Sequence, residues 1–81
     1  MLFNKGDHVL INKQNSYIGK GTVFYICKTI DDLQSFFNES HPHYSKYALF
    51  ITNNKPIYIV NLDGDMGQAG CLEKELSTYP S

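Results

Sequence analysis

The chain has 81 residues, of which 42% are hydrophobic and 19% are charged, and its formal net charge is −1. This composition indicates a single globular domain over residues 1–81 and excludes a disordered or highly charged chain. A chain of this length buries roughly 60–65% of its unfolded surface, so we expect one modest core and little room for a deep catalytic cavity.

The N-terminal residues, Met1 to Asp7, contain neither the apolar segment nor the cleavage site of a signal peptide. No apolar run approaches the roughly 20 residues that span a bilayer. We therefore expect a complete cytoplasmic protein that does not associate with a membrane. Its frequent lysine, asparagine, isoleucine and tyrosine would suit an AT-rich genome, such as that of a phage or a low-GC bacterium.

All seven basic residues are lysines, no two of them are adjacent, and arginine is absent. Arginine supplies the forked pair of donors that binds phosphates and guanine edges, whereas lysine is a point charge. Affinity for nucleic acid depends largely on clustered positive charge. The sequence therefore disfavours nucleic acid as the principal partner.

The first half of the chain predicts two strands and a helix. Residues 8–13 alternate as a strand does, with Val9 and Ile11 on one face, and a loop over residues 14–20 follows. Residues 21–28 are rich in β-branched and aromatic side chains and predict a second strand.

A short helix is predicted within residues 29–40. Thr29 or Asp31 can act as its N-cap, and Asp31 and Asp32 suit the positive end of a helix. Its apolar face is formed by residues spaced i, i+3 and i+4, which are Leu33, Phe36 and Phe37.

The second half predicts strands over residues 46–52 and 56–62, joined by a tight turn at Asn53-Asn54, because asparagine tolerates left-handed conformations. A glycine-rich loop is predicted over residues 63–70. After it, Cys71 and Leu72 could start a closing strand, and residues 72–76 could equally form a helical turn.

These elements predict a mainly β fold with one short helix. We expect a small, partly open antiparallel barrel of about five strands, with the helix inserted between strands two and three. The strands over residues 46–52 and 56–62 are partly apolar on both faces. One face must line the barrel, and the helix is the available cover for the other.

Two glycine elements resemble the start of a src-homology-type small barrel, as in KOW-like and Tudor-like modules. They are Lys5-Gly6-Asp7, before the first strand, and Gly19-Lys20-Gly21-Thr22-Val23, at the second. Residues 58–62, 70–72 and 76 resemble the final strands and closing turn of such barrels. The segment 29–45 is longer than the hairpin of a minimal barrel. The resemblance implies a fold and does not carry a function.

Metal-binding and catalytic patterns are weak. A His-x-His pair such as His41-Pro42-His43 can chelate zinc, with Cys27, Cys71 or Asp32 as further ligands, but the chain has no Cys-x-x-Cys. We expect two solvated histidines and two reduced, buried cysteines.

The segment Asp63-Gly64-Asp65-Met66-Gly67 begins like a calcium-binding loop, but glycine is at position 5 instead of 6 and Lys74 is at position 12. Cys71 with His41 or His43 and Asp63 could be combined into a nucleophilic site, yet no spacing supports it. We expect no enzymatic activity and no cofactor.

Tyrosine is the remaining signal, because it combines a large apolar body with a polar tip and is favoured at interfaces. These rings could simply close the ends of the barrel. The functional alternative is a partner-binding surface formed by Tyr17, Tyr25, Tyr44, Tyr47 and Tyr58.

Three hypotheses follow. The first is a non-enzymatic protein–protein interaction module, either an accessory or inhibitory factor acting on a larger protein or a homo-oligomer. The second is a small barrel that stacks single-stranded nucleic acid on exposed rings, with Lys13, Lys20 and Lys28 on the backbone. The third is a metal or small-molecule site around His41, His43 and Cys71.

Overall fold

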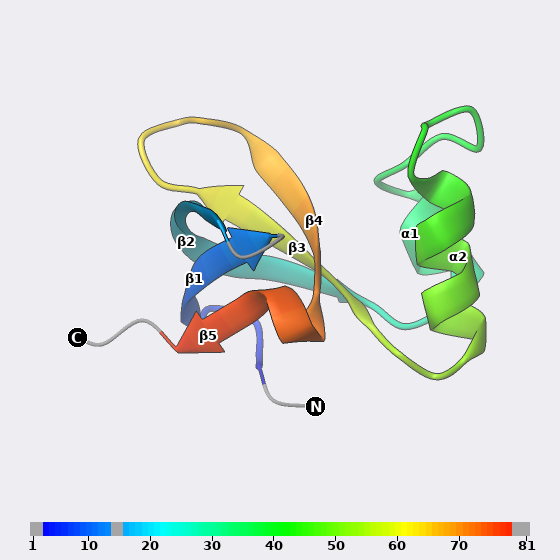
Figure 1. The fold of residues 1–81 in the computed structure, drawn as a ribbon. Coiled ribbons are helices and arrows are strands. Elements are labelled where there is room, and N and C mark those ends of the chain that lie inside the picture. The colour runs from blue at the N-terminus through cyan, green and yellow to red at the C-terminus, as the bar shows by residue number, and fades with distance from the viewer. Residues whose placement is uncertain (1–2, 14–15, 79–81) are drawn as a thin grey trace.

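The computed structural model describes residues 3–13 and 16–78. Their five strands form one antiparallel sheet in the order β4-β3-β2-β1-β5, which is open between its two edges (Figure 1). This mainly β architecture confirms the predicted fold class. The strands are β1 (His8–Lys13), β2 (Ser16–Cys27), β3 (Ile57–Leu62), β4 (Gln68–Leu72) and β5 (Leu76–Thr78).

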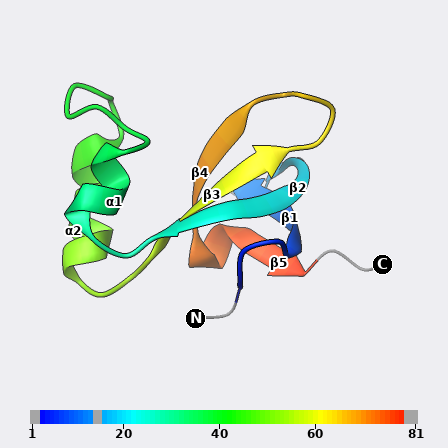
Figure 2. The same ribbon diagram turned by 180° about the vertical axis from the view of Figure 1, so that it is seen from behind.

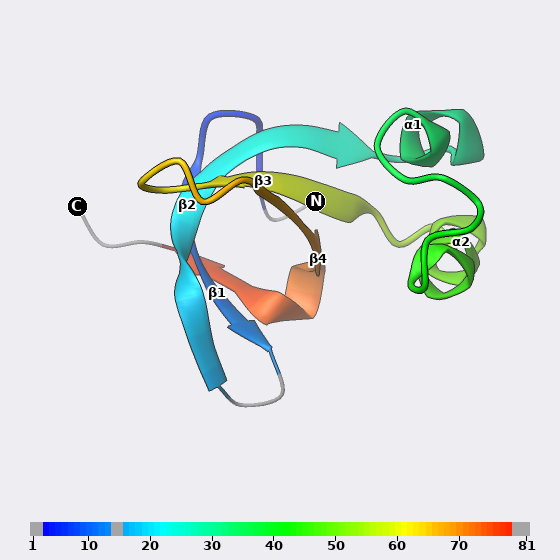
Figure 3. The same cartoon turned by 90° about the horizontal axis from the view of Figure 1, so that it is seen from above.

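Strand β2 determines the curvature of the sheet. It is 12 residues long and pairs first with β1 and then with β3. The register shifts between Ile11 and Asn12 and again between Val23 and Tyr25. Such irregularities bend a strand and increase its twist, and Figure 3 shows β2 curving around the sheet. The curved sheet packs a first core that includes Val9, Ile11, Val23, Tyr58, Val60 and Cys71.

The two predicted glycine elements require glycine for different physical reasons. Gly6 has a φ of 89°, and its N–H donates to the Val23 carbonyl at 2.8 Å, so it forms the turn that leads into β1. Gly21 is needed for close approach, because a Cβ there would overlap the Asn61 carbonyl oxygen on β3. A Cβ at Gly19 would meet nothing within 4 Å.

Helix α1 (Ile30–Gln34) lies within the predicted helical segment and is shorter than it. Its capping box is complete: the Asp32 N–H donates to the Thr29 hydroxyl, and the Asp32 carboxylate accepts from the Thr29 N–H. Leu33 is fully buried, while Phe36 and Phe37 are half-buried. Leu33 therefore forms the inward face of α1 as predicted, whereas Phe36 and Phe37 follow the end of the helix and pack against the same core from there.

The predicted strand over residues 46–52 is wrong, because this segment belongs to helix α2 (Tyr44–Thr52). Alternation and apolar content suggested a strand, but the side chains that pack inward recur with helical spacing. Tyr47 and Ile51 are buried four residues apart, and Tyr44 and Ala48 are half-buried beside them. The described chain therefore has two helices between β2 and β3, where one was expected.

Other boundaries also differ from the prediction. Strand β2 already begins at Ser16, so most of the expected loop over residues 14–20 is strand. Strand β4 begins at Gln68 instead of Cys71, and the predicted helical turn is present after it as the 3₁₀ turn η1 (Glu73–Glu75). The Asn53-Asn54 turn connects α2 to β3 instead of two strands. Asn54 has the expected left-handed conformation, with a φ of 62°.

The helices lie together beside one end of the sheet, where the ends of β2 and β3 extend toward them (Figures 1 and 2). A second core forms there from Cys27, Leu33, Tyr47, Ile51, Ile57, Ile59 and Leu72. The Tyr47 hydroxyl donates to the carbonyl of Gly70 on edge strand β4, at 3.2 Å. The helices therefore cover part of an edge that would otherwise be open to pairing with another strand.

Neither α1 nor α2 approaches the length of a membrane-spanning helix, and within residues 3–13 and 16–78 there is no apolar helix that could cross a bilayer.

Candidate functional site

Two of the five tyrosines expected at a partner-binding surface are core residues. Tyr58 is fully buried on β3, where its ring packs edge-on against Phe3 and its hydroxyl donates to the Glu73 carboxylate at 3.2 Å. Tyr47 is 5% exposed, and its hydroxyl donates a hydrogen bond to the Gly70 carbonyl. The expectation that these two rings lie on the surface is therefore wrong, because they fill the two cores.

Tyr25 and Tyr44 are half-buried, and both connect to α1. The Tyr25 hydroxyl donates to Asp32 at 3.3 Å, and the negative charge of Asp32 raises the pKa of Tyr25. The Tyr44 hydroxyl accepts from the Gln34 side chain at 3.2 Å. Tyr17 pairs with Asn12 through the backbone in β2, and its side chain lies outside the described part of the chain. The hydrogen bonds of Tyr25 and Tyr44 therefore hold α1 in place.

The Asp32 carboxylate is an ionised structural group. The backbone N–H groups of Lys28 and Thr29 donate to it at 3.0 and 3.2 Å. These bonds favour the carboxylate form, so they lower the pKa of Asp32, with the bond from Lys28 as the largest cause. An acid that is held ionised in this way serves the helix cap and does not suit a proton donor.

The cysteines and histidines of the metal hypothesis lie in different surroundings. Cys27 and Cys71 are buried and not linked to each other, as expected of reduced cysteines. Burial raises the pKa of Cys27 to about 12, so it is a neutral thiol at pH 7 and a poor nucleophile.

His41 and His43 are exposed ahead of α2, with ring centroids 5.7 Å apart, and the His43 N–H donates to His41 Nδ1 at 3.1 Å. Cys71 belongs instead to the first core, within the sheet. Among the residues that the structure describes, no group of three or more His, Cys, Asp and Glu side chains could hold a metal.

Two of the three lysines of the nucleic-acid hypothesis lie on β2 or directly after it. Lys20 and Lys28 are exposed, the first within β2 and the second directly after it. Lys13 ends β1, and its side chain is outside the description.

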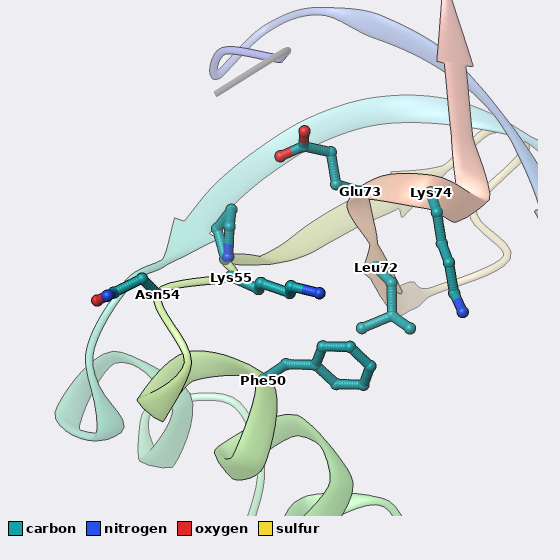
Figure 4. A pocket seen from close by; sticks show the side chains of 7 residues that line it. Phe50, Asn54, Lys55, Leu72, Glu73 and Lys74 are labelled. Carbon is teal, nitrogen blue, oxygen red and sulfur yellow. The ribbon is translucent and has the colours of Figure 1, made fainter.

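A groove lies between the C-terminal end of α2 and the turn η1 (Figure 4). Its volume is about 510 Å³, and its apolar surface comes from one residue of α2, one that precedes β3 and one that ends β4. We call it the α2–η1 groove, and it is lined by Phe50, Asn54, Lys55, Pro56, Leu72, Glu73 and Lys74.

The positive side chains of this groove lie beside its apolar floor, and its negative side chain points away from it. Lys55 and Lys74 are exposed, and in Figure 4 their side chains extend beside Phe50 and Leu72. The Lys55 ammonium lies 5.9 Å from the centroid of the Phe50 ring. The Glu73 carboxylate accepts from the buried Tyr58 hydroxyl and points away from Phe50 and Leu72 in Figure 4. The groove therefore presents two cations beside an apolar floor.

Exposed apolar surface continues from the groove along α2. Leu49 is 63% exposed, and it lines a neighbouring cavity of about 350 Å³ together with Asn53 and with two residues of the groove, Phe50 and Lys55. The expected strand over residues 46–52 hid this surface, because it placed Leu49 and Phe50 on opposite faces. The signal was in the sequence: Lys46, Leu49, Phe50 and Asn53 have the spacing of one helical face.

Comparison with known proteins finds no match for the chain, whether among protein-family models, curated proteins or solved structures.

Proposed function

We propose that this protein is a non-enzymatic protein-interaction module that holds a segment of a partner protein in the α2–η1 groove. The observation that carries the proposal is the apolar floor of Phe50, Pro56 and Leu72 beside two lysines, extended by the exposed Leu49. Phe50 and Pro56 are half-buried, Leu72 is buried beneath them and Leu49 is exposed. Apolar surface that is rimmed by polar side chains in this way is typical of interaction sites.

The chemistry of the groove specifies its occupant. A large apolar side chain would cover Phe50 and Leu72, and neighbouring carboxylates would face Lys55 and Lys74. Burying one such apolar side chain contributes about 1.5–3 kcal/mol, and each exposed ion pair contributes about 0.2–1 kcal/mol. Together, these contributions to the binding free energy correspond to weak, transient binding. Such binding suits an accessory or inhibitory factor that docks on a larger protein.

In this proposal the scaffold is a src-homology-type small barrel. Three features support that assignment: the strand order, the Gly6 turn before β1, and the η1 turn, which carries the chain from edge strand β4 to edge strand β5. The segment between β2 and β3 then supplies one wall of the groove, while η1 supplies the other.

A displayed peptide library tests the proposal with the purified protein as bait. We expect the selected peptides to combine a large apolar residue with Asp or Glu, and to lose binding to the variant Lys55→Glu/Lys74→Glu. The matched control is Lys5→Glu/Lys28→Glu, which changes the charge equally at two exposed lysines that do not line the groove. The control should retain binding.

Because all four lysines are exposed, both variants should fold, and their thermal melting confirms this. Peptides that bind the groove variant as well as they bind the wild type would show that the partner docks elsewhere. A selection that enriches no peptide at all would also contradict the proposal.

A further inference from the structure

The loop that joins β3 and β4, residues 63–67, displays the most exposed of the three large hydrophobic side chains on the described surface. Met66 is 75% exposed, compared with 63% for Leu49 and 48% for Phe24. Exposed carboxylates precede it at Asp63 and Asp65. An apolar side chain next to two acidic ones is the pattern that the α2–η1 groove is expected to bind.

The backbone gives this loop a defined shape. Gly64, Asp65 and Gly67 have φ values of 75°, 57° and 93°, so the chain turns tightly around Met66. The Leu62 N–H donates to the Gly67 carbonyl at 2.8 Å and closes the loop. A segment that is already ordered loses less conformational freedom on binding than a flexible one.

Loop and groove complement each other in charge and polarity. The loop offers one thioether side chain and two carboxylates, and the groove offers an apolar floor and two ammonium groups. Methionine is unbranched and adapts to irregular apolar surfaces, so it suits the space beside Phe50 and Leu72. Opposite charges at the rim of such a contact accelerate association and fix its orientation.

The loop of one molecule lies away from its own groove. In Figures 1, 2 and 3 the connection between β3 and β4 is at the end of the sheet far from the helices, whereas the groove is lined by the end of α2. A contact between them therefore requires two molecules.

We infer that the α2–η1 groove receives the 63–67 loop of a second copy of this chain, with Met66 on the apolar floor and its carboxylates at Lys55 and Lys74. This inference rests on the proposed function, because it names the partner that occupies the same groove. Two copies that exchange loops reciprocally form a closed pair, and one-way contacts build a longer chain. A loop of five residues buries little surface, so the association is weak and depends on concentration.

Sedimentation velocity over a concentration series measures the association, and labelled methionine methyl groups locate it. The chain has only two methionines, so the Met66 signal is easily assigned by substitution. We expect the average mass and the Met66 methyl shift to change together as concentration rises. The association should weaken about tenfold or more in Lys55→Glu/Lys74→Glu, and it should be unchanged in Lys5→Glu/Lys28→Glu.

A mixing experiment makes the test specific. Met66→Ser removes the apolar side chain of the loop but leaves its charges and the groove intact. Alone, this variant and the groove variant should each remain monomeric. Mixed, they should form a complex that stops at one copy of each, because only the intact loop of the groove variant can enter the intact groove of the other.

A wild-type protein that stays monomeric at millimolar concentration overturns the inference, as does self-association that both variants retain. Failure to form the mixed complex overturns it as well. The proposed function is tested separately by the peptide selection. Groove-dependent peptides with a monomeric protein would refute only the second copy as partner, whereas a selection without such peptides refutes the proposed function itself.

Discussion

The contact between the helices and edge strand β4 gives the sharpest test of the fold, at Gly70. A Cβ at this position would lie 2.7 Å from Phe37 Cζ and 3.2 Å from the nearest carbon of Tyr47. Both rings belong to the helical segment, so the glycine is needed because aromatic side chains pack directly on the strand. We expect Gly70→Ala to push these rings away from β4 and to destabilise the fold.

The magnitude follows from the cost of overpacking a well-filled core, which is about 1–3 kcal/mol. Replacing glycine by alanine in a strand also gains about 0.5–1 kcal/mol from reduced backbone freedom. Gly19→Ala is the matched control for that gain, because Gly19 also lies in a strand and a Cβ there meets nothing within 4 Å. The difference in unfolding free energy between the two variants therefore isolates the cost of the overlap between the added Cβ and the two aromatic rings.

Urea and thermal unfolding followed by circular dichroism measure this difference. For a domain of this size it corresponds to about 5–20 °C in Tm, with Gly70→Ala the less stable variant. Phe37→Leu, which shortens the overlapping side chain, should cost less in the Gly70→Ala background than in the wild type. If Gly70→Ala is as stable as Gly19→Ala, the helices do not pack on β4 as described.

Two further predictions concern titration. The pKa of Asp32 is lower in the folded protein than its ordinary value of 3.8, so its contribution to stability is present above that value and is lost as the pH falls through the folded pKa. Urea midpoints should show the stability gap between wild type and Asp32→Asn narrowing toward about pH 2, and a constant gap would contradict the role of its carboxylate. The pKa of Cys27 is raised from 9.0 to about 12, so the neutral thiol contributes stability below pH 9.0 that is lost as the pH rises toward 12. At neutral pH a thiol reagent should modify Cys27 and Cys71 only when the protein unfolds, and rapid labelling of the native protein would show that they are accessible.

Local patterns in the sequence correctly predicted the elements that local chemistry decides. Alternating Val9 and Ile11 gave β1 its inward face, and Thr29 and Asp32 form the cap that starts α1. Asparagine adopts the left-handed turn at Asn54. In each case the determining interaction lies within a few residues of the chain, so it can be read without knowing the rest of the fold.

The candidate site was not predictable in the same way. Tyr47 and Tyr58 combine an apolar ring with a polar tip, and the sequence does not say whether that tip meets water or a buried acceptor. In the structure the acceptors are the Gly70 carbonyl and the Glu73 carboxylate, which lie 23 and 15 residues away. The groove likewise joins α2 to η1, and nothing in either segment specifies the other.

The sequence by itself determined a mainly β chain with a capped helix and glycine turns, because periodicity, capping and backbone freedom act over short distances. The two buried cysteines were expected from residue type alone. Only the tertiary structure decided that residues 44–52 form a helix. That segment has an apolar pattern compatible with a strand or a helix, and the choice depends on what it packs against. Here the helix buries Tyr47 and Ile51 against the ends of β2 and β3 and covers part of the β4 edge, which leaves Leu49 and Phe50 beside the groove.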